Sequence, residues 1–183
     1  MGKRLLLFFV FLLLWLTACT ELGVATKIHK VRQHKIILPE VLLCIDNGSE
    51  SLVHEDDETH AQYIVYIDSS ECKTCILTHP EQFEALYHIQ DAYGSFGIKI
   101  ILSPGTDYLS EVVEEIRNLN LTFPIYLDIE NKFKRLNAFL PDDSRFHSFL
   151  LDKQMRPIFV GSPFANKNAK ALFEKKLHEV CDY

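Results

Sequence analysis

From residue 60 onward, hydrophobic and polar residues alternate with two different periods. Short runs rich in Ile, Val, Phe and Tyr have the length and composition of strands, and they cover residues 62–67, 97–102, 123–127, 145–151 and 157–161. Longer segments repeat hydrophobic residues at helical spacing, and they cover residues 72–93, 107–119, 131–139 and 169–180. Helices separate the first three strands, which should therefore be parallel, while a short turn should join the last two as an antiparallel hairpin. We expect an α/β fold with a mixed central sheet of about five strands, flanked by helices.

The chain before residue 60 has weaker patterns. Residues 36–39 and 41–45 are two apolar pieces broken at Pro39, which predicts extended chain. Residues 46–60 are polar and are expected to form a solvated loop. Four consecutive acidic residues lie in this segment, whereas a calcium loop would space its ligands alternately. Residues 20–30 show little pattern and suit a spacer.

The N-terminus predicts an export signal. Lys3 and Arg4 precede an unbroken apolar run of 12 residues from Leu5 to Leu16, which is too short to span a bilayer. The residues before Cys19 resemble the lipobox of bacterial lipoproteins. That resemblance implies cleavage before Cys19 and acylation of its thiol, for example by palmitate. The alternative is an ordinary cleaved signal that happens to contain this cysteine.

Composition limits the organisation and the partners of the chain. We expect a signal peptide at 1–18, a tether at 19–33, an N-terminal extension with the acidic loop at 34–60, and the main domain at 61–183. The formal charge is −6, and loss of Lys3 and Arg4 lowers it by two, to −8. An acidic chain without a basic stripe argues against nucleic acid and against electrostatic docking on anionic lipid.

The candidate chemistry lies in Cys72-Lys73-Thr74-Cys75, directly after the first predicted strand of the domain. A thiol at a helix N-terminus has a lowered pKa, because unsatisfied amides favour the thiolate. Cys72 would then attack a disulfide, and Cys75 would resolve the mixed disulfide. Lys73 adds a cation that favours the thiolate. Asp68, four residues before Cys72, is a candidate proton relay, or alternatively a cap of the loop that follows.

The order β-α-β-α-β-α-β-β-α with this motif resembles the thioredoxin-like superfamily, in particular its exported, membrane-tethered TlpA/ResA-like branch. Two further features support the resemblance: Pro80, five residues after Cys75, and the Phe149-Leu150-Leu151-Asp152 run before the final hairpin. The resemblance implies a three-layer fold, a Cys72–Cys75 redox pair without a cofactor, and a helix kinked at Pro80. The alternative is that the helix begins at Pro80, since proline is favoured at the first helical position.

The chain departs from that family at two positions. The family has a cis-proline before the penultimate strand, which presents a backbone edge to substrate and blocks metal binding; here Phe146 stands in its place. Thioredoxins also carry a buried acid six residues before the first cysteine, where this chain has Tyr66. Substrate docking and proton transfer should therefore differ from the family pattern.

These features predict a lipid-anchored thiol–disulfide oxidoreductase in the cell envelope of a Gram-negative bacterium, facing the periplasm. Its expected partners are exported cysteine-containing proteins, a membrane electron relay, and the bilayer through acyl chains on Cys19. One alternative is a binding lipoprotein whose Cys72–Cys75 bridge is structural or vestigial. Another is a metal site on Cys72, Cys75 and His79, although a surface histidine on a helix is the commoner case. Two remaining cysteines, Cys44 and Cys181, suit a small buried hydrophobe and an incidental tail thiol better than a bridge.

Overall fold

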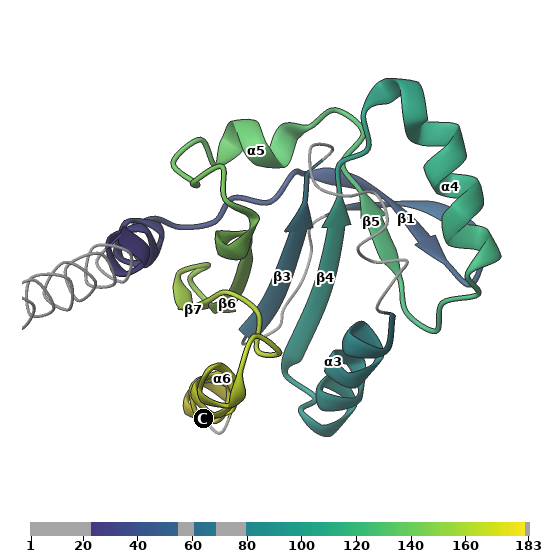
Figure 1. The fold of residues 1–183 in the computed structure, drawn as a ribbon. Coiled ribbons are helices and arrows are strands. Elements are labelled where there is room, and N and C mark those ends of the chain that lie inside the picture. Colours follow the sequence, from purple (N-terminus) through teal and green to yellow (C-terminus); the bar gives the residue numbers. More distant parts are fainter. Residues whose placement is uncertain (1–22, 55–60, 69–79, 182–183) are drawn as a thin grey trace, which may run out of the picture.

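Seven strands form one mixed sheet with helices on both of its faces (Figure 1). The computed structural model describes residues 23–54, 61–68 and 80–181. Across the sheet the strand order is β2-β1-β5-β4-β3-β6-β7. β3 and β4 lie near its centre, and every residue of both strands is buried.

The bounds of the elements follow the predicted order from residue 61 onward. The strands are β1 (Val41–Asp46), β2 (Ser49–His54), β3 (Ala61–Ile67), β4 (Phe96–Leu102), β5 (Ile125–Leu127), β6 (Ser148–Asp152) and β7 (Pro157–Val160). The α-helices after β1 are α3 (Pro80–Ala92), α4 (Leu109–Asn118), α5 (Lys132–Leu136) and α6 (Lys167–Cys181), and two short 3-10 helices are η1 (Thr106–Tyr108) and η2 (Ser144–Phe146). One more helix, residues 23–32, precedes β1 and is called the N-terminal helix below.

The strand directions confirm the sequence prediction. β3 pairs parallel with β4, and β4 pairs parallel with β5. β6 runs antiparallel to both β3 and β7. The α/β class, the mixed sheet and the final antiparallel hairpin are therefore as predicted, and β3 to β7 are the strands expected between residues 60 and 181.

The loop predicted at residues 46–60 is wrong for residues 49–54, which form β2. β1 and β2 make an antiparallel hairpin, and Asn47 and Gly48 occupy its turn with φ angles of 47° and 76°. Two positive φ angles match the type I′ turn that Asn-Gly favours. β2 is an edge strand with almost no buried residue, so it lacks the alternation that marks a half-buried strand. Because β1 also pairs with β5, this hairpin extends the main sheet.

The spacer prediction is wrong for residues 23–32, which form the N-terminal helix. Val31 is fully buried and belongs to a core cluster with residues of β3, β6 and α5. Val24, Ile28 and Val31 follow i, i+4, i+7 spacing, the pattern of a helix with a narrow apolar stripe. Polar and basic residues fill the rest of the segment and obscure this stripe in the sequence.

The sheet separates two cores. We call the larger side, covered by α3, α4 and α6, the α4 face; its core includes Leu86, Val112 and Phe173. We call the other side, covered by the N-terminal helix and α5, the α5 face; its core includes Val31, Tyr66 and Phe133. In the part of the chain that the structure describes, no helix is both long enough and apolar enough to cross a membrane.

Candidate active site

Three polar residues follow the three parallel strands at one edge of the sheet. Asp68 comes after β3, Ser103 after β4 and Asp128 after β5, and all three are buried. Two hydrogen bonds from Ser103 join the ends of the three strands. The Ser103 amide donates to the Ile67 carbonyl at 2.9 Å, and the Ser103 hydroxyl donates to the Asp128 carbonyl at 3.1 Å. The carboxyl ends of parallel strands are the usual place for a functional site in an α/β sheet.

Asp68 is held by an ion pair with α5. Its carboxylate is 5% exposed, and its Oδ2 lies 2.6 Å from Nζ of Lys134, whose side chain is 44% exposed. A buried carboxylate without a partner is costly, so the pair fixes both the charge and the position of Asp68. The pair places a buried acid, with a cation that reaches solvent, four residues before Cys72 in the chain.

Asp128 positions the helix that carries Lys134. Its two carboxylate oxygens accept hydrogen bonds from the Lys132 and Phe133 amides at 2.9 and 2.7 Å. These amides belong to the first turn of α5, where no intrahelical acceptor is available. Sequence reasoning missed this role, because Asp128 lies four residues before α5 begins, outside the usual position of a capping residue.

Tyr66 fills the position of the buried acid in thioredoxins. It is buried on the α5 face, where its ring stacks on Phe133 with centroids 4.4 Å apart. Its hydroxyl donates to Oδ1 of Asn131 at 3.0 Å. The Tyr66 side chain is thus accommodated in a packed core. Asp68, two residues further along the chain, is the acid nearest in sequence to the motif among the residues that the structure describes.

Phe146 lies at the end of η2, directly before β6, and is buried. Two cations lie over its ring: Lys27 Nζ at 5.4 Å from the centroid and the Arg145 guanidinium at 5.8 Å. No peptide bond within the described residues is cis. The residue that the resemblance aligns with the proline is therefore an aromatic ring with two basic side chains near it.

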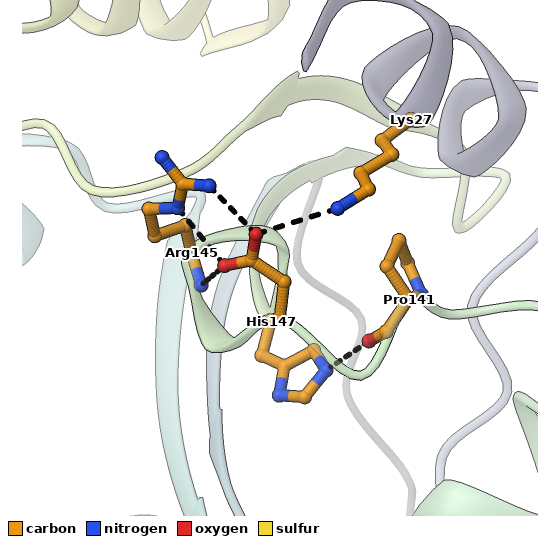
Figure 2. Close-up of polar contacts among 5 residues, drawn as sticks. Lys27, Pro141, Arg145 and His147 are labelled. Atoms are coloured by element: carbon orange, nitrogen blue, oxygen red, sulfur yellow. Dashed lines mark hydrogen bonds and ion pairs between the residues drawn. The ribbon is translucent and has the colours of Figure 1, made fainter. Parts of the chain in front are cut away.

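The segment around Phe146 is fixed by two sets of polar contacts (Figure 2). His147 Nε2 donates to the Pro141 carbonyl at 2.7 Å, and the His147 carbonyl accepts from the Tyr66 amide at 2.9 Å. Asp143 accepts from the Arg145 guanidinium at 2.9 and 2.7 Å and lies 3.5 Å from Lys27 Nζ. The hydrogen bonds from Arg145 hold the pKa of the Asp143 carboxyl well below its usual range. The N-terminal helix thus contacts the segment that precedes β6 through Lys27.

Several predicted site residues lie outside the described residues: Cys19, Cys72, Lys73, Cys75 and His79. α3 is described from Pro80 onward, so the predicted helix start at Cys72 and the kink at Pro80 stay predictions. Among the described residues there is no cluster of His, Cys, Asp and Glu able to hold a metal ion. No disulfide joins Cys44 to Cys181, and burial raises the pKa of the Cys44 thiol.

Comparison with known proteins identifies the fold through structure alone. No family model and no curated protein matches the sequence. A putative thiol:disulfide interchange protein DsbE from Chlorobium tepidum matches with a TM-score of 0.51 at 15% identity, over 80% of this chain and 98% of that one. A putative protein disulfide isomerase from Bacteroides thetaiotaomicron matches with a TM-score of 0.52 at 14% identity, over 81% and 92%.

Another solved structure, whose name does not refer to disulfide exchange, has a similar TM-score. AhpC from Mycobacterium tuberculosis has a TM-score of 0.50 at 12% identity, over 78% of this chain and 96% of that one. Differently named proteins therefore share this fold, so the function of this chain must be argued from its site. Together the neighbours and the sheet topology show that this chain has the thioredoxin-like fold.

Proposed function

We propose that this protein is an exported, lipid-anchored thiol–disulfide oxidoreductase that exchanges disulfides through Cys72 and Cys75. The observation that carries the proposal is the location of the motif in the chain. The Cys-x-x-Cys sequence follows the buried central strand β3 and its ion-paired Asp68, and it precedes α3 in a thioredoxin-like fold. A pair of cysteines between a strand and a helix of this fold is the arrangement used for disulfide exchange.

The proposed reaction balances without a cofactor. The Cys72 thiolate attacks one sulfur of a substrate disulfide, and the substrate S–S bond breaks to release one substrate thiolate. The Cys75 thiolate then attacks the Cys72 sulfur, which forms the Cys72–Cys75 disulfide and releases the second substrate thiolate. The substrate gains two electrons and, from solvent, two protons, while the protein loses the same number. The reverse sequence oxidises a dithiol substrate.

Asp68 and Lys134 would support this chemistry at the strand end. A buried carboxylate beside a partly exposed ammonium can pass a proton between the resolving thiol and solvent. Lys73 would favour the Cys72 thiolate through its charge. The substrates would be exported cysteine-containing proteins, and a membrane electron relay would restore the starting redox state. The cell envelope of a Gram-negative bacterium, on its periplasmic side, would be the site of action.

A titration of the two thiols tests the enzyme proposal. In the reduced full chain, the alkylation rate of Cys72 should follow a pKa below the ordinary value of about 8.5, while Cys75 should react more slowly. Cys44, whose thiol pKa is raised by burial in β1, serves as an internal unreactive control. Equal and slow alkylation of Cys72 and Cys75 would count against an exchange enzyme.

The anchor has a separate test. Expression in a bacterium should give a membrane-fraction protein that incorporates labelled palmitate, and Cys19→Ser should abolish the label. Undiminished labelling of that variant would refute acylation at Cys19.

A second candidate function is a thioredoxin-fold binding lipoprotein with a structural Cys72–Cys75 bridge. The packing of Tyr66 and Phe146 favours it, because both positions that the family uses for catalysis and docking hold buried aromatic rings. The thiol titration separates the two functions, since a structural bridge needs no thiolate at neutral pH.

A further inference from the structure

The segment from residue 23 to 39 is basic, although the chain as a whole has a formal charge of −6. It contains no acidic residue. Its four basic side chains, Lys27, Lys30, Arg32 and Lys35, are all exposed. Net charge therefore conceals a local concentration of positive charge on the N-terminal helix and on the chain that follows it.

Three of these charges have no ion-pair partner among the residues that the structure describes. Lys27 is paired with Asp143. Among the residues that the structure describes, no acidic side chain lies within ion-pair distance of Lys30, Arg32 or Lys35. Arg135 on α5 is exposed and also has no such partner there. These four cations remain available to a partner outside the domain.

Two exposed aliphatic side chains accompany the cations. Ile37 is 50% exposed and Leu136 is 42% exposed. The Asn137 side chain brings them close, because its Oδ1 accepts from the Ile37 amide at 2.9 Å and its Nδ2 donates to the Ile37 carbonyl at 2.8 Å. Arg135 and Leu136 directly precede Asn137 in the chain, and Lys35 lies two residues before Ile37, so the two joined segments carry both the cations and the aliphatic residues.

The surface is held in place by the fold. Val31 and Ile36 are buried in the core of the α5 face. The His34 ring stacks on Phe139 with centroids 4.3 Å apart, and the Ile36 amide donates to the Met155 carbonyl at 2.9 Å. In Figure 1 the N-terminal helix (purple) lies at the edge of the domain, on the side of β6 and β7. The cations are thus presented by an ordered part of the domain.

We propose that this basic surface, comprising Lys30, Arg32, Lys35, Ile37 and the last turn of α5, binds the anionic headgroups of a phospholipid bilayer. Cations paired with exposed aliphatic residues suit a membrane interface, where the charge meets phosphate and the aliphatic groups enter the headgroup region. The position in the chain agrees, since Gly23 follows closely after the apolar run Leu5–Leu16 and Cys19. The inference does not depend on the thiol chemistry of the proposed function.

Docking by this surface would orient the domain. The α5 face would lie toward the bilayer, and the acidic helices α3 and α4 would lie away from it. The exposed acids on these two helices, such as Glu84, Glu111 and Glu114, would be repelled by an anionic membrane. The basic surface would therefore orient the domain on the bilayer, in addition to the attachment proposed at Cys19.

The test measures vesicle co-sedimentation of the full chain carrying Cys19→Ser, so that acyl chains do not contribute. Vesicles of pure phosphatidylcholine are compared with vesicles containing phosphatidylglycerol at low ionic strength. The run Leu5–Leu16 acts on both vesicle types, so the readout is the ratio of the two affinities. We expect clear preference for the anionic vesicles, and its loss in high salt because of screening.

Charge reversal identifies the surface. Lys30→Glu/Arg32→Glu/Lys35→Glu should lower the affinity for anionic vesicles by at least about tenfold. The matched control, Lys167→Glu/Lys170→Glu/Lys175→Glu, changes the net charge equally on exposed positions of α6, which packs on the α4 face. It should retain most of the affinity. Ile37→Ser/Leu136→Ser, which leaves every charge in place, should also weaken binding.

Three outcomes would overturn the proposal. They are equal binding of the full chain to both vesicle types, equal loss in the two charge-reversed variants, and tight salt-sensitive binding to an RNA oligonucleotide or polyglutamate but not to the vesicles. Palmitate labelling of the unmodified chain is scored separately, so that failure of surface docking is distinguished from failure of the anchor.

Discussion

The two faces of the sheet differ in how they are built and in how far they follow the family pattern. The α4 face has the larger core and is covered by three helices, of which α4 has the clearest hydrophobic stripe. The α5 face is covered by the short α5 and by a helix from the start of the chain. Tyr66, Phe146 and the partner of Asp68 all belong to the α5 side. The departures from the family are therefore gathered where an unexpected helix packs.

Tyr66 and Phe146 each have specific partners on the α5 side. Tyr66 needs an apolar stack and an acceptor, which Phe133 and Asn131 provide at the start of α5. The Lys27 ammonium and the Arg145 guanidinium lie over the Phe146 ring. The N-terminal helix is thus part of the surroundings of the candidate site.

The largest expected effect concerns the core of the α5 face. Phe133 is fully buried, so Phe133→Ala should lower the free energy of unfolding by about 3–5 kcal/mol through lost burial and a residual cavity. Leu136→Ala, on the same helix but exposed, should cost less than about 1 kcal/mol. Urea unfolding measures both. A similar small loss in the two variants would mean that α5 does not pack on the sheet.

The next effect concerns the attachment of residues 36–38 to α5. Asn137 is fully buried, and its side chain bonds both the Ile37 backbone and the Phe133 carbonyl. Asn137→Ala removes three hydrogen bonds and should cost about 2–3 kcal/mol. Asn118→Ala, at an exposed position of α4, is the control and should change stability by less than about 0.5 kcal/mol. Equal unfolding midpoints would contradict the described attachment.

A smaller effect compares the two tyrosines of β3, one on each face. The Tyr66 hydroxyl donates to Asn131, and the Tyr63 hydroxyl donates to the Gly161 carbonyl at 3.1 Å. Tyr66→Phe and Tyr63→Phe should each cost about 1 kcal/mol. Only Tyr66→Phe should change the alkylation rate of Cys72, because Tyr66 lies on the side of Asp68. An equal change in both variants would show that the two faces do not differ in their coupling to the thiols.

The smallest effect is a pH dependence. Hydrogen bonds from Arg145 lower the pKa of Asp143 in the folded chain, while an unfolded aspartate titrates near about 3.9. The stabilisation is therefore fully present above about pH 4 and is lost as the pH falls through the lowered folded value. Asp143→Asn should remove this part of the acid sensitivity in urea unfolding at pH 6 and below. Parallel pH profiles for the two proteins would contradict it.

The sequence predicted the α4 face better than the α5 face for physical reasons. Helix α4 shows its stripe because Val112, Val113 and Ile116 are buried, while three glutamates occupy other positions of the helix. The N-terminal helix and β2 were missed, because a single narrow stripe and an exposed edge strand give weak periodic signals. Net charge also carries limited spatial information, since it averages acidic helices with a basic segment.

Within the candidate site, residue types could be predicted but not their partners. Asp68 was expected from its spacing to Cys72, and its burial is visible only once β3 lies in the sheet. Lys134 and Asp128 both come from the β5–α5 junction, far along the chain from Asp68. No local pattern connects these residues, because the parallel strand ends bring them together.

The central claim is that Cys72 attacks and Cys75 resolves, and trapping of mixed disulfides tests it most directly. The full chain is expressed with Cys75→Ser or with Cys72→Ser, and disulfide-linked partners are separated without reductant. The account predicts abundant adducts with exported proteins for Cys75→Ser, because the intermediate on Cys72 is no longer resolved, and far fewer for Cys72→Ser. Equal, near-absent adducts in both variants would contradict it and favour a structural bridge.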